Sequence, residues 1–201
     1  MSFLLKRLSE FSNLIEKTVF SVKNTDILFW QAKEKIHGIL SESIRLKRKV
    51  FVIGNGGSSG IASHHVVDLV NVVKAPAFAL SDSNLITCMG NDYGYPKIFS
   101  KPLENLAHES DILIAISSSG QSQNILEACK VMRQKNGVII TLSGFKEDNP
   151  LRSAGDLNIW TGVHDYGLVE SAHFFILHTF IDAWAQKVSL QQTQTAGISK
   201  E

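Results

Sequence analysis

The sequence has no excess of charge of either sign. Among its 201 residues, 20 are lysine or arginine and 19 are aspartate or glutamate. A chain balanced in this way offers no broad electrostatic attraction to nucleic acid or to an anionic membrane. It also lacks an apolar run near the roughly 20 residues of a membrane-spanning helix, and residues 1–7 lack the pattern of a signal peptide. We therefore expect a cytoplasmic protein.

Cysteine is scarce, because only Cys88 and Cys129 are present. The two cysteines have no metal-binding spacing, and both fall within predicted helices. We therefore expect two buried free thiols, which fits a reducing compartment. The hydrophobic fraction, by contrast, is 44%, which is enough for one domain with a substantial core.

The sequence also lacks the lysine-containing loop with which many nucleotide-binding proteins hold phosphate. It does have two apolar segments that lead into small residues and then into a helical pattern. The first is 50–60, VFVIGNGGSSG, and the second is 111–122, DILIAISSSGQS. Backbone amides freed by glycine, serine hydroxyls and a helix N-terminus together suit an anion. The two junctions predict a site for a phosphorylated ligand.

Two other interpretations of these loops stay open. The dinucleotide fingerprint Gly-x-Gly-x-x-Gly is incomplete, because Ser59 stands where the third glycine would follow Gly54. Asp82 follows the second predicted strand, where such enzymes have an acidic residue. The incomplete fingerprint therefore weakens the hypothesis of a nicotinamide-dependent enzyme but does not exclude it. Either loop alone is also compatible with an ordinary strand–helix connection. Two such loops in one small chain favour the ligand site.

From residue 49 onward, apolar strand patterns alternate with amphipathic helical patterns. The predicted strands are 49–53, 77–80, 111–116, 137–142 and 157–161, and the predicted helices are 58–73, 83–90, 95–107, 121–135 and 166–187. Continuously apolar strands are typical of a sheet that is covered on both faces. The pattern predicts an α/β fold, a three-layer αβα sandwich with a five-stranded parallel sheet. Ligands of such sheets bind beyond the carboxyl ends of the strands.

The residues before this core form an N-terminal helical pair in our prediction, over 3–46. One apolar stripe has three- and four-residue spacing, at Leu4, Leu8, Phe11, Ile15 and Val19. A second helix follows residues 24–26, with Asn24 or Thr25 as its cap. We expect one domain over 1–188, in which 1–46 serve assembly and 49–187 form the core. The polar tail 189–201 is predicted to be disordered.

Four residues on two predicted helices form a candidate metal site. His64 and Asp68 are four residues apart and share a helix face. Glu170 and His178, on the last helix, differ by about 80° around its axis. Two histidines and two carboxylates suit zinc or another divalent ion. The alternatives are a surface His–Asp pair and a buried, structural histidine.

Three motifs resemble those of the sugar isomerase (SIS) domain family, in its phosphoheptose isomerase branch. They are 54–58 (GNGGS), 90–94 (GNDYG) and 117–122 (SSSGQS), and the likeness extends over about 49–187. The resemblance implies a five-stranded parallel sheet between helices, in a homotetramer with sites at subunit interfaces. It implies isomerisation of sedoheptulose 7-phosphate to D-glycero-D-manno-heptose 7-phosphate through an enediol, for bacterial heptose and lipopolysaccharide precursors.

The resemblance also implies roles for individual residues. The phosphate would bind Ser117, Ser118, Ser119 and Ser122. The rest of the substrate would contact Asn55, Gly56, Gly57, Ser58, Asp68, Asn91, Asp92 and Glu170. One zinc or other divalent ion per site would be held by His64, Asp68, Glu170 and His178. We assign Asp68 as the catalytic base and His178 as the partner acid or base.

Two positions depart from the family's pattern. Asp68 stands where the pattern has glutamate, and Glu170 where it has glutamine. Both changes keep oxygen ligands, so metal binding survives as a hypothesis. They also motivate an alternative function, that of a non-catalytic SIS protein that binds a sugar phosphate or regulates a partner, such as a replication initiator.

Overall fold

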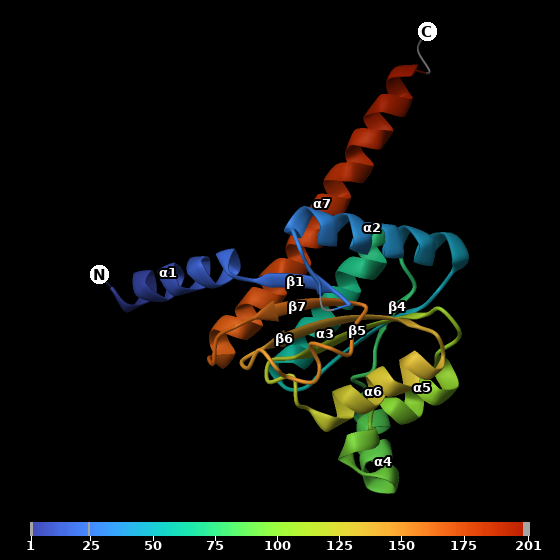
Figure 1. Ribbon diagram of the computed structural model, residues 1–201. Helices are drawn as coiled ribbons and strands as arrows, with labels where there is room; N and C mark the ends of the chain where they lie inside the picture. Colours follow the sequence, from blue (N-terminus) through green and yellow to red (C-terminus); the bar gives the residue numbers. More distant parts are fainter. Residues whose placement is uncertain (1, 24, 199–201) are drawn as a thin grey trace.

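The structure, a computed structural model, describes residues 2–23 and 25–198, with side chains as far as residue 190. A central sheet lies between two layers of helices (Figure 1). The strands are β1 (Val19–Val22), β2 (Thr25–Ile27), β3 (Val50–Gly54), β4 (Ala77–Ala79), β5 (Ile112–Ser117), β6 (Val138–Gly144) and β7 (Leu157–Thr161). The helices are α1 (Phe3–Glu16), α2 (Phe29–Leu46), α3 (Gly57–Asp68), α4 (Ser83–Tyr93), α5 (Ser100–Leu106), α6 (Gln123–Gln134) and α7 (Tyr166–Ile198).

The sheet has seven strands within the described residues, in the order β2-β1-β7-β6-β5-β3-β4. The five strands from β7 to β4 are parallel, as predicted. The prediction of a five-stranded, wholly parallel sheet is wrong, however, because β1 and β2 add two antiparallel strands beside β7. β3 and β5 are buried along their whole length, as expected for strands that are covered on both faces.

The prediction of helix throughout 3–46 is wrong between α1 and α2. β1 and β2 instead pair antiparallel and extend the sheet, with Phe20 opposite Ile159 of β7. Val19 therefore belongs to a strand rather than to a helical stripe, because pairing with β7 satisfies its backbone. Thr25 lies in β2, and Leu28 is the N-cap of α2. Asn24 lies outside the described residues.

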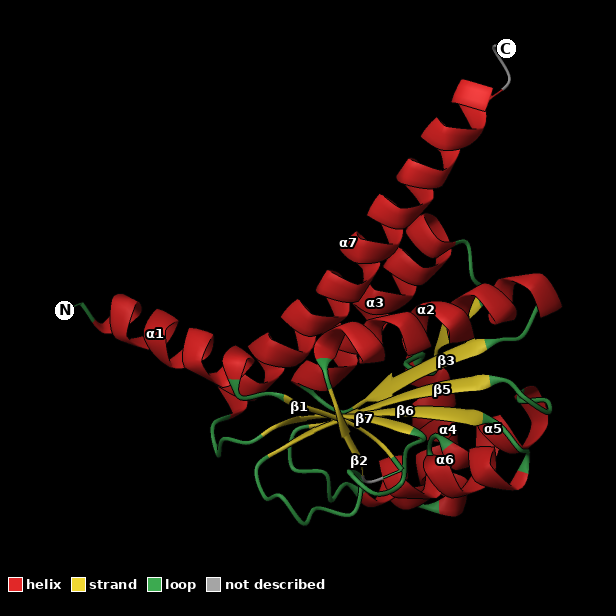
Figure 2. Ribbon diagram, turned by 45° about the horizontal axis from the view of Figure 1, so that its top comes forward, coloured by secondary structure: helices red, strands yellow, loops and turns green. Residues whose placement is uncertain are grey.

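The two helical layers bury opposite faces of the strands. Val50 and Val52 belong to the core under α2, α3 and α7. Phe51 and Ile53 belong to the core under α4, α5 and α6. This alternation along β3 follows from the two-residue period of a strand. Figure 2 shows the two layers on either side of the sheet.

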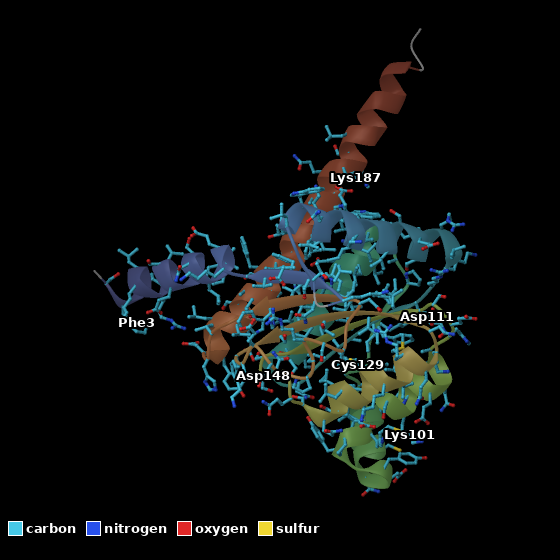
Figure 3. The ribbon with its side chains drawn as sticks, viewed as in Figure 1. Phe3, Lys101, Asp111, Cys129, Asp148 and Lys187 are labelled. Carbon is cyan, nitrogen blue, oxygen red and sulfur yellow. The ribbon has the colours of Figure 1, made fainter. Side chains whose placement is uncertain are left out.

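Two helices extend beyond this sandwich. α1 projects to one side, with Phe3 at its outer end (Figure 3). α7 stays helical to Ile198, so the predicted helix end near 187 and the predicted disorder of 189–198 are incorrect. Residues 189–196 contain no glycine or proline, and extending an existing helix costs little. Residues 199–201 lie outside the described part. No described helix is long and apolar enough to cross a membrane.

The two cysteines differ in their surroundings. Cys129 is buried in α6, as predicted. Cys88 is exposed, which contradicts the prediction, because α4 buries none of its residues. A hydrogen bond to Asp92 raises the pKa of the Cys88 thiol.

Candidate active site

The two predicted ligand loops meet at one cavity of about 220 Å³, at the carboxyl ends of β3 and β5. It is lined by Asn55, Gly56, Gly57, Ser58, Ile116, Ser117, Ser118, Ser119, Ser122, Tyr166 and Glu170. Thus eight of the predicted substrate residues in the two loops, and Glu170 of α7, share one hollow. A larger cavity of about 660 Å³ lies beside Arg7 and Asp165, but neither loop lines it.

The serine loop connects β5 to α6 and presents hydroxyl groups at the start of that helix. Gly120 adopts a φ of +65°, which glycine tolerates without a steric penalty. The hydroxyl of Ser117 donates to that of Ser122 over 3.2 Å. The hydroxyl of Ser118 is buried and has no hydrogen-bond partner among the described residues. A buried polar group of this kind is costly unless a ligand satisfies it.

The glycine loop connects β3 to α3. Gly56 has a φ of +54°, and the helix begins at the next residue, Gly57. Gly54 packs so tightly that a Cβ there would lie 2.6 Å from the carbonyl carbon of Ser58. The first-turn amides of α3 therefore lie at the end of β3, where a helix N-terminus favours an anion.

Glu170 lies in this loop cavity. A Cβ on Gly57 would collide with the Glu170 carboxylate. The carboxylate therefore occupies space that only a glycine at position 57 leaves open. It is the one acidic side chain among the residues that line the cavity, and none of them is lysine, arginine or histidine.

The other three predicted metal ligands gather elsewhere. One ligand atom each of His64, Asp68 and His178 lies within 4.8 Å of the others. Oδ2 of Asp68 is 3.6 Å from Nε2 of His64 and 3.5 Å from Nδ1 of His178. Two ligands of a tetrahedral zinc ion are separated by about 3.4 Å, given zinc–ligand bonds near 2.1 Å. Oδ2 of Asp68 is also buried and, in the part of the chain that the structure describes, has no hydrogen-bond partner. This cluster therefore fits a divalent ion.

The structure therefore separates the predicted quartet into a trio and a single residue. Glu170 and His178 are eight positions apart on α7, which corresponds to about 12 Å along the helix. Glu170 contacts the first residue of α3, whereas His178 contacts the last. Within one chain, the loop cavity and the His–Asp–His cluster lie at opposite ends of α3.

Two further histidines near the cluster are buried and uncharged. Burial lowers the pKa of His65 to about 3, with smaller contributions from His178 and His64. Burial also lowers the pKa of His173 to about 4. Nε2 of His173 lies 3.1 Å from the carbonyl oxygen of Ser143. His173 thereby joins α7 to β6.

Asn91 and Asp92 do not line the cavity in this chain. The Asn91 amide donates to Asp92 over 2.9 Å, and both side chains are exposed on α4. Their contact with substrate stays a prediction. Tyr95, from the same polar segment, instead donates to Oδ1 of Asn55 over 3.1 Å. Sequence reasoning missed Tyr95, Asn124 and Tyr166. Asn124 had a usable signal, because it is a polar residue directly after the serine loop.

Comparison with known proteins places this geometry in a family. A family model of the SIS domain matches residues 30–144. The phosphoheptose isomerase of Campylobacter concisus is 35% identical over 151 residues, which cover 72% of this chain and 79% of that protein. That of Cytophaga hutchinsonii is 32% identical over 186 residues, which cover 90% and 94%.

A solved structure agrees with these sequence relationships. The phosphoheptose isomerase of Francisella tularensis has a TM-score of 0.74 and 28% identity, and the match covers 92% of this chain and all of that one. The loops that close the cavity are the motifs on which the resemblance rests. The chain belongs to the SIS domain family and, within it, to the phosphoheptose isomerases.

Proposed function

We propose that the protein is an enzyme that isomerises sedoheptulose 7-phosphate to D-glycero-D-manno-heptose 7-phosphate. The observation that carries the proposal is the cavity in which the serine and glycine loops meet. Relatives that match most of this chain are named phosphoheptose isomerases. The reaction would supply heptose for lipopolysaccharide precursors, and we place it in the cytoplasm.

The serine loop is suited to the phosphate group. Its hydroxyls and the N-termini of α3 and α6 supply hydrogen-bond donors and positive dipole ends without a lysine or arginine. The free hydroxyl of Ser118 would gain a partner when phosphate binds. Binding through neutral donors fixes the position of the phosphate and of the sugar chain attached to it.

The chemical step moves hydrogen between two adjacent carbons and needs no co-reactant. A base takes a proton from C1 of the open-chain ketose, and the electron pair forms the C1=C2 bond while the C2 oxygen gains a proton. The resulting enediol takes a proton at C2 and loses one from the C1 oxygen, which yields the aldose. Such a reaction needs one base and one acid. We assign Asp68 as the base and His178, 3.5 Å away, as its partner.

A divalent metal ion, zinc in the first instance, would be held by His64, Asp68 and His178. When bound, it would polarise the oxygens at C1 and C2 as a Lewis acid. Three protein ligands are the number typical of a catalytic zinc site. Glu170 of the same chain is too far along α7 to join the trio, so its predicted role as a ligand would require a second chain.

The separation of cavity and cluster supports a site shared between chains. We infer that the loop cavity and Glu170 of one chain face the His–Asp–His cluster of another, in a homotetramer. The outer half of α1 provides an apolar surface for assembly, since Phe3, Leu4, Leu5 and Leu8 are exposed. The inner half is already covered, because Phe11 packs on Phe175 of α7.

The test is turnover of sedoheptulose 7-phosphate by the purified protein, followed by detection of the heptose product. We expect Asp68→Asn and His178→Ala to abolish turnover and to leave the circular dichroism spectrum unchanged. Near-normal turnover in either variant would refute the assignment of that residue. No product from the wild-type protein with any divalent metal would favour the non-catalytic SIS protein instead.

A further inference from the structure

A closed hydrogen-bond network surrounds the side chain of Asn55, which lines the loop cavity. Its Nδ2 donates to Oδ1 of Asn124 over 2.9 Å, and its Oδ1 accepts from Nδ2 of Asn124 over 2.8 Å. The Oδ1 atom also accepts from the hydroxyl of Tyr95. Asn124 is only 2% exposed, so its side of the pairing is shielded from water.

The orientation of both amides follows from one backbone group. The amide N–H of Ile125 lies 3.0 Å from Oδ1 of Asn124. Because a backbone N–H can only donate, the atom facing it must be an oxygen, and Nδ2 of Asn124 must face Asn55. Oδ1 of Asn55 must then be the atom that accepts the hydrogen bond from Nδ2 of Asn124. The reverse orientation would place two donors and two acceptors against each other.

The network leaves the side-chain amide of Asn55 with a single free hydrogen-bonding group. A carbonyl oxygen has two acceptor sites, and both are used, by Asn124 and Tyr95. The amide nitrogen has two N–H groups, and one is used by Asn124. In this arrangement Asn55 offers a ligand in the cavity one N–H donor and no acceptor.

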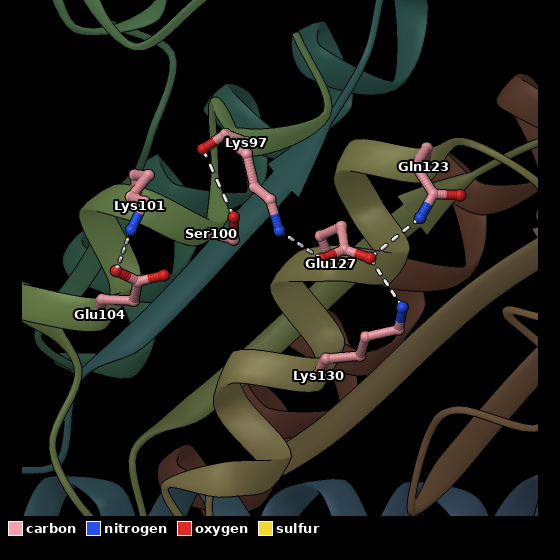
Figure 4. A network of polar contacts seen from close by, with 7 residues as sticks. All are labelled: Lys97, Ser100, Lys101, Glu104, Gln123, Glu127 and Lys130. Atoms are coloured by element: carbon pink, nitrogen blue, oxygen red, sulfur yellow. Dashed lines mark hydrogen bonds and ion pairs between the residues drawn. The ribbon is translucent and has the colours of Figure 1, made fainter. Parts of the chain in front are cut away.

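Tyr95 is itself held in place, although its ring is largely exposed. It begins the short 3₁₀ helix Tyr95–Lys97. Nζ of Lys97 lies 2.6 Å from the carboxylate of Glu127 on α6. Figure 4 shows that Gln123 and Lys130 contact the same carboxylate. The two lysines lower the pKa of Glu127 to about 2, so the contact persists through the physiological pH range.

We propose that Asn124 and Tyr95 are positioning residues that lock Asn55 as a donor toward an acceptor oxygen of the sugar phosphate. The inference rests on the proposed function and adds to it the direction of one hydrogen bond and the two residues that set it. The acceptor is either a phosphate oxygen or the oxygen that gains negative charge in the enediol step. A donor aimed at such an oxygen contributes much more to catalysis than an ordinary surface contact.

The experiment is a double-mutant cycle on kcat/KM for sedoheptulose 7-phosphate. We expect Asn55→Ala to lower kcat/KM by about 100-fold. We expect Asn124→Ala or Tyr95→Phe alone to lower it by roughly 3- to 10-fold, as for the loss of one neutral hydrogen bond. In the Asn55→Ala background, either change should alter kcat/KM by less than about 2-fold, because the residue through which it acts is absent.

Equal factors in both backgrounds would overturn the proposal, since a structural role would persist without Asn55. Tyr93→Phe is the matched control, because Tyr93 is an exposed tyrosine two residues away whose ring lies beside Lys101. Among the described residues its hydroxyl makes no hydrogen bond to Asn55, unlike that of Tyr95. An equal effect of the two tyrosine variants would also refute the proposal. If Asn124→Ala does not fold, the Tyr95 cycle decides alone.

Two further readouts separate the possible outcomes. A phosphate contact changes KM and the affinity for inorganic phosphate measured by calorimetry, whereas a contact to the enediol oxygen changes kcat. If the wild-type protein shows no turnover, the proposed function fails. The same cycle is then measured on the dissociation constant of sedoheptulose 7-phosphate. Non-additive losses of affinity support the locked donor, and additive losses refute it.

Discussion

Two glycines of one loop are expected to respond in opposite ways to the same substitution. At Gly54, an added Cβ meets the backbone of Ser58, with the carbonyl carbon at 2.6 Å. Backbone in a buried first turn cannot move aside cheaply. At Gly57, the atoms nearest to an added Cβ all belong to the carboxylate of Glu170, which is the far end of a flexible side chain and can rotate away.

The magnitudes follow from what must move. Overpacking of a buried site costs about 1–3 kcal/mol. A chain of this size loses roughly 2–4 °C of Tm for each kcal/mol, so Gly54→Ala should lower Tm by about 2–12 °C. Gly57→Ala places alanine, a better helix former, in the first turn of α3, so its Tm should stay within about 2 °C of wild type. Its kcat/KM should nevertheless fall by roughly 10-fold or more, because Glu170 is displaced and the cavity is partly filled.

The assays are thermal unfolding by circular dichroism and turnover of sedoheptulose 7-phosphate for both variants. A Gly57→Ala protein with wild-type kcat/KM would show that neither the position of Glu170 nor the space above Gly57 matters for the reaction. A Gly54→Ala protein with unchanged Tm would refute the packing argument for the glycine loop.

Three further predictions test the metal, the buried histidine and the assembly surface. Protein purified without chelator should contain about one zinc-type ion per chain by elemental analysis. The His64→Ala variant should lose this ion. A fully active wild-type enzyme that contains no metal would rule out a required metal ion. The pKa of His173 is about 4 in the folded chain and 6.5 in the unfolded chain. Between these values the unfolded chain binds more protons, so stability falls as the pH drops from 6.5 toward 4. The loss is about 3 kcal/mol, at 1.36 kcal/mol per pKa unit. Urea unfolding from pH 7 to 5 should show a flatter dependence for His173→Gln, and an unchanged slope would contradict the assignment. Leu4→Glu with Leu8→Glu should convert the proposed tetramer to smaller species in sedimentation and lower activity with it. Wild-type chains that sediment as monomers at micromolar concentration would refute the proposed assembly.

The parts of this fold that depend on local patterns can be predicted from the sequence. Continuous apolar runs such as 112–116 indicate buried parallel strands, and the small residues after them indicate the ligand loops. The β1–β2 hairpin cannot be found in this way. Val19 pairs with Trp160, 141 positions later, and a four-residue strand also fits a helical stripe.

In the candidate site, too, local spacing can be predicted from the sequence, whereas contacts between distant residues cannot. The spacing of His64 and Asp68 predicts their shared face, and the structure brings them together with His178. The angle of Glu170 around α7 says nothing about its rise along the axis, and that rise separates it from the cluster. Asn124 escapes prediction because its role depends on contact with Asn55, 69 positions away.

Mixing of two inactive variants tests most directly whether one active site is built from the loop cavity of one chain and the His–Asp–His cluster of another. Asp68→Asn removes the base, and Ser119→Glu places a negative charge in the serine loop. Each variant alone should be inactive. In hybrids, the intact cavity of one chain meets the intact cluster of its neighbour, so co-expressed chains mixed at random should regain about a quarter of wild-type activity. Failure of the co-expressed mixture to exceed the separate variants, with hybrids verified by mass spectrometry, would contradict the shared site.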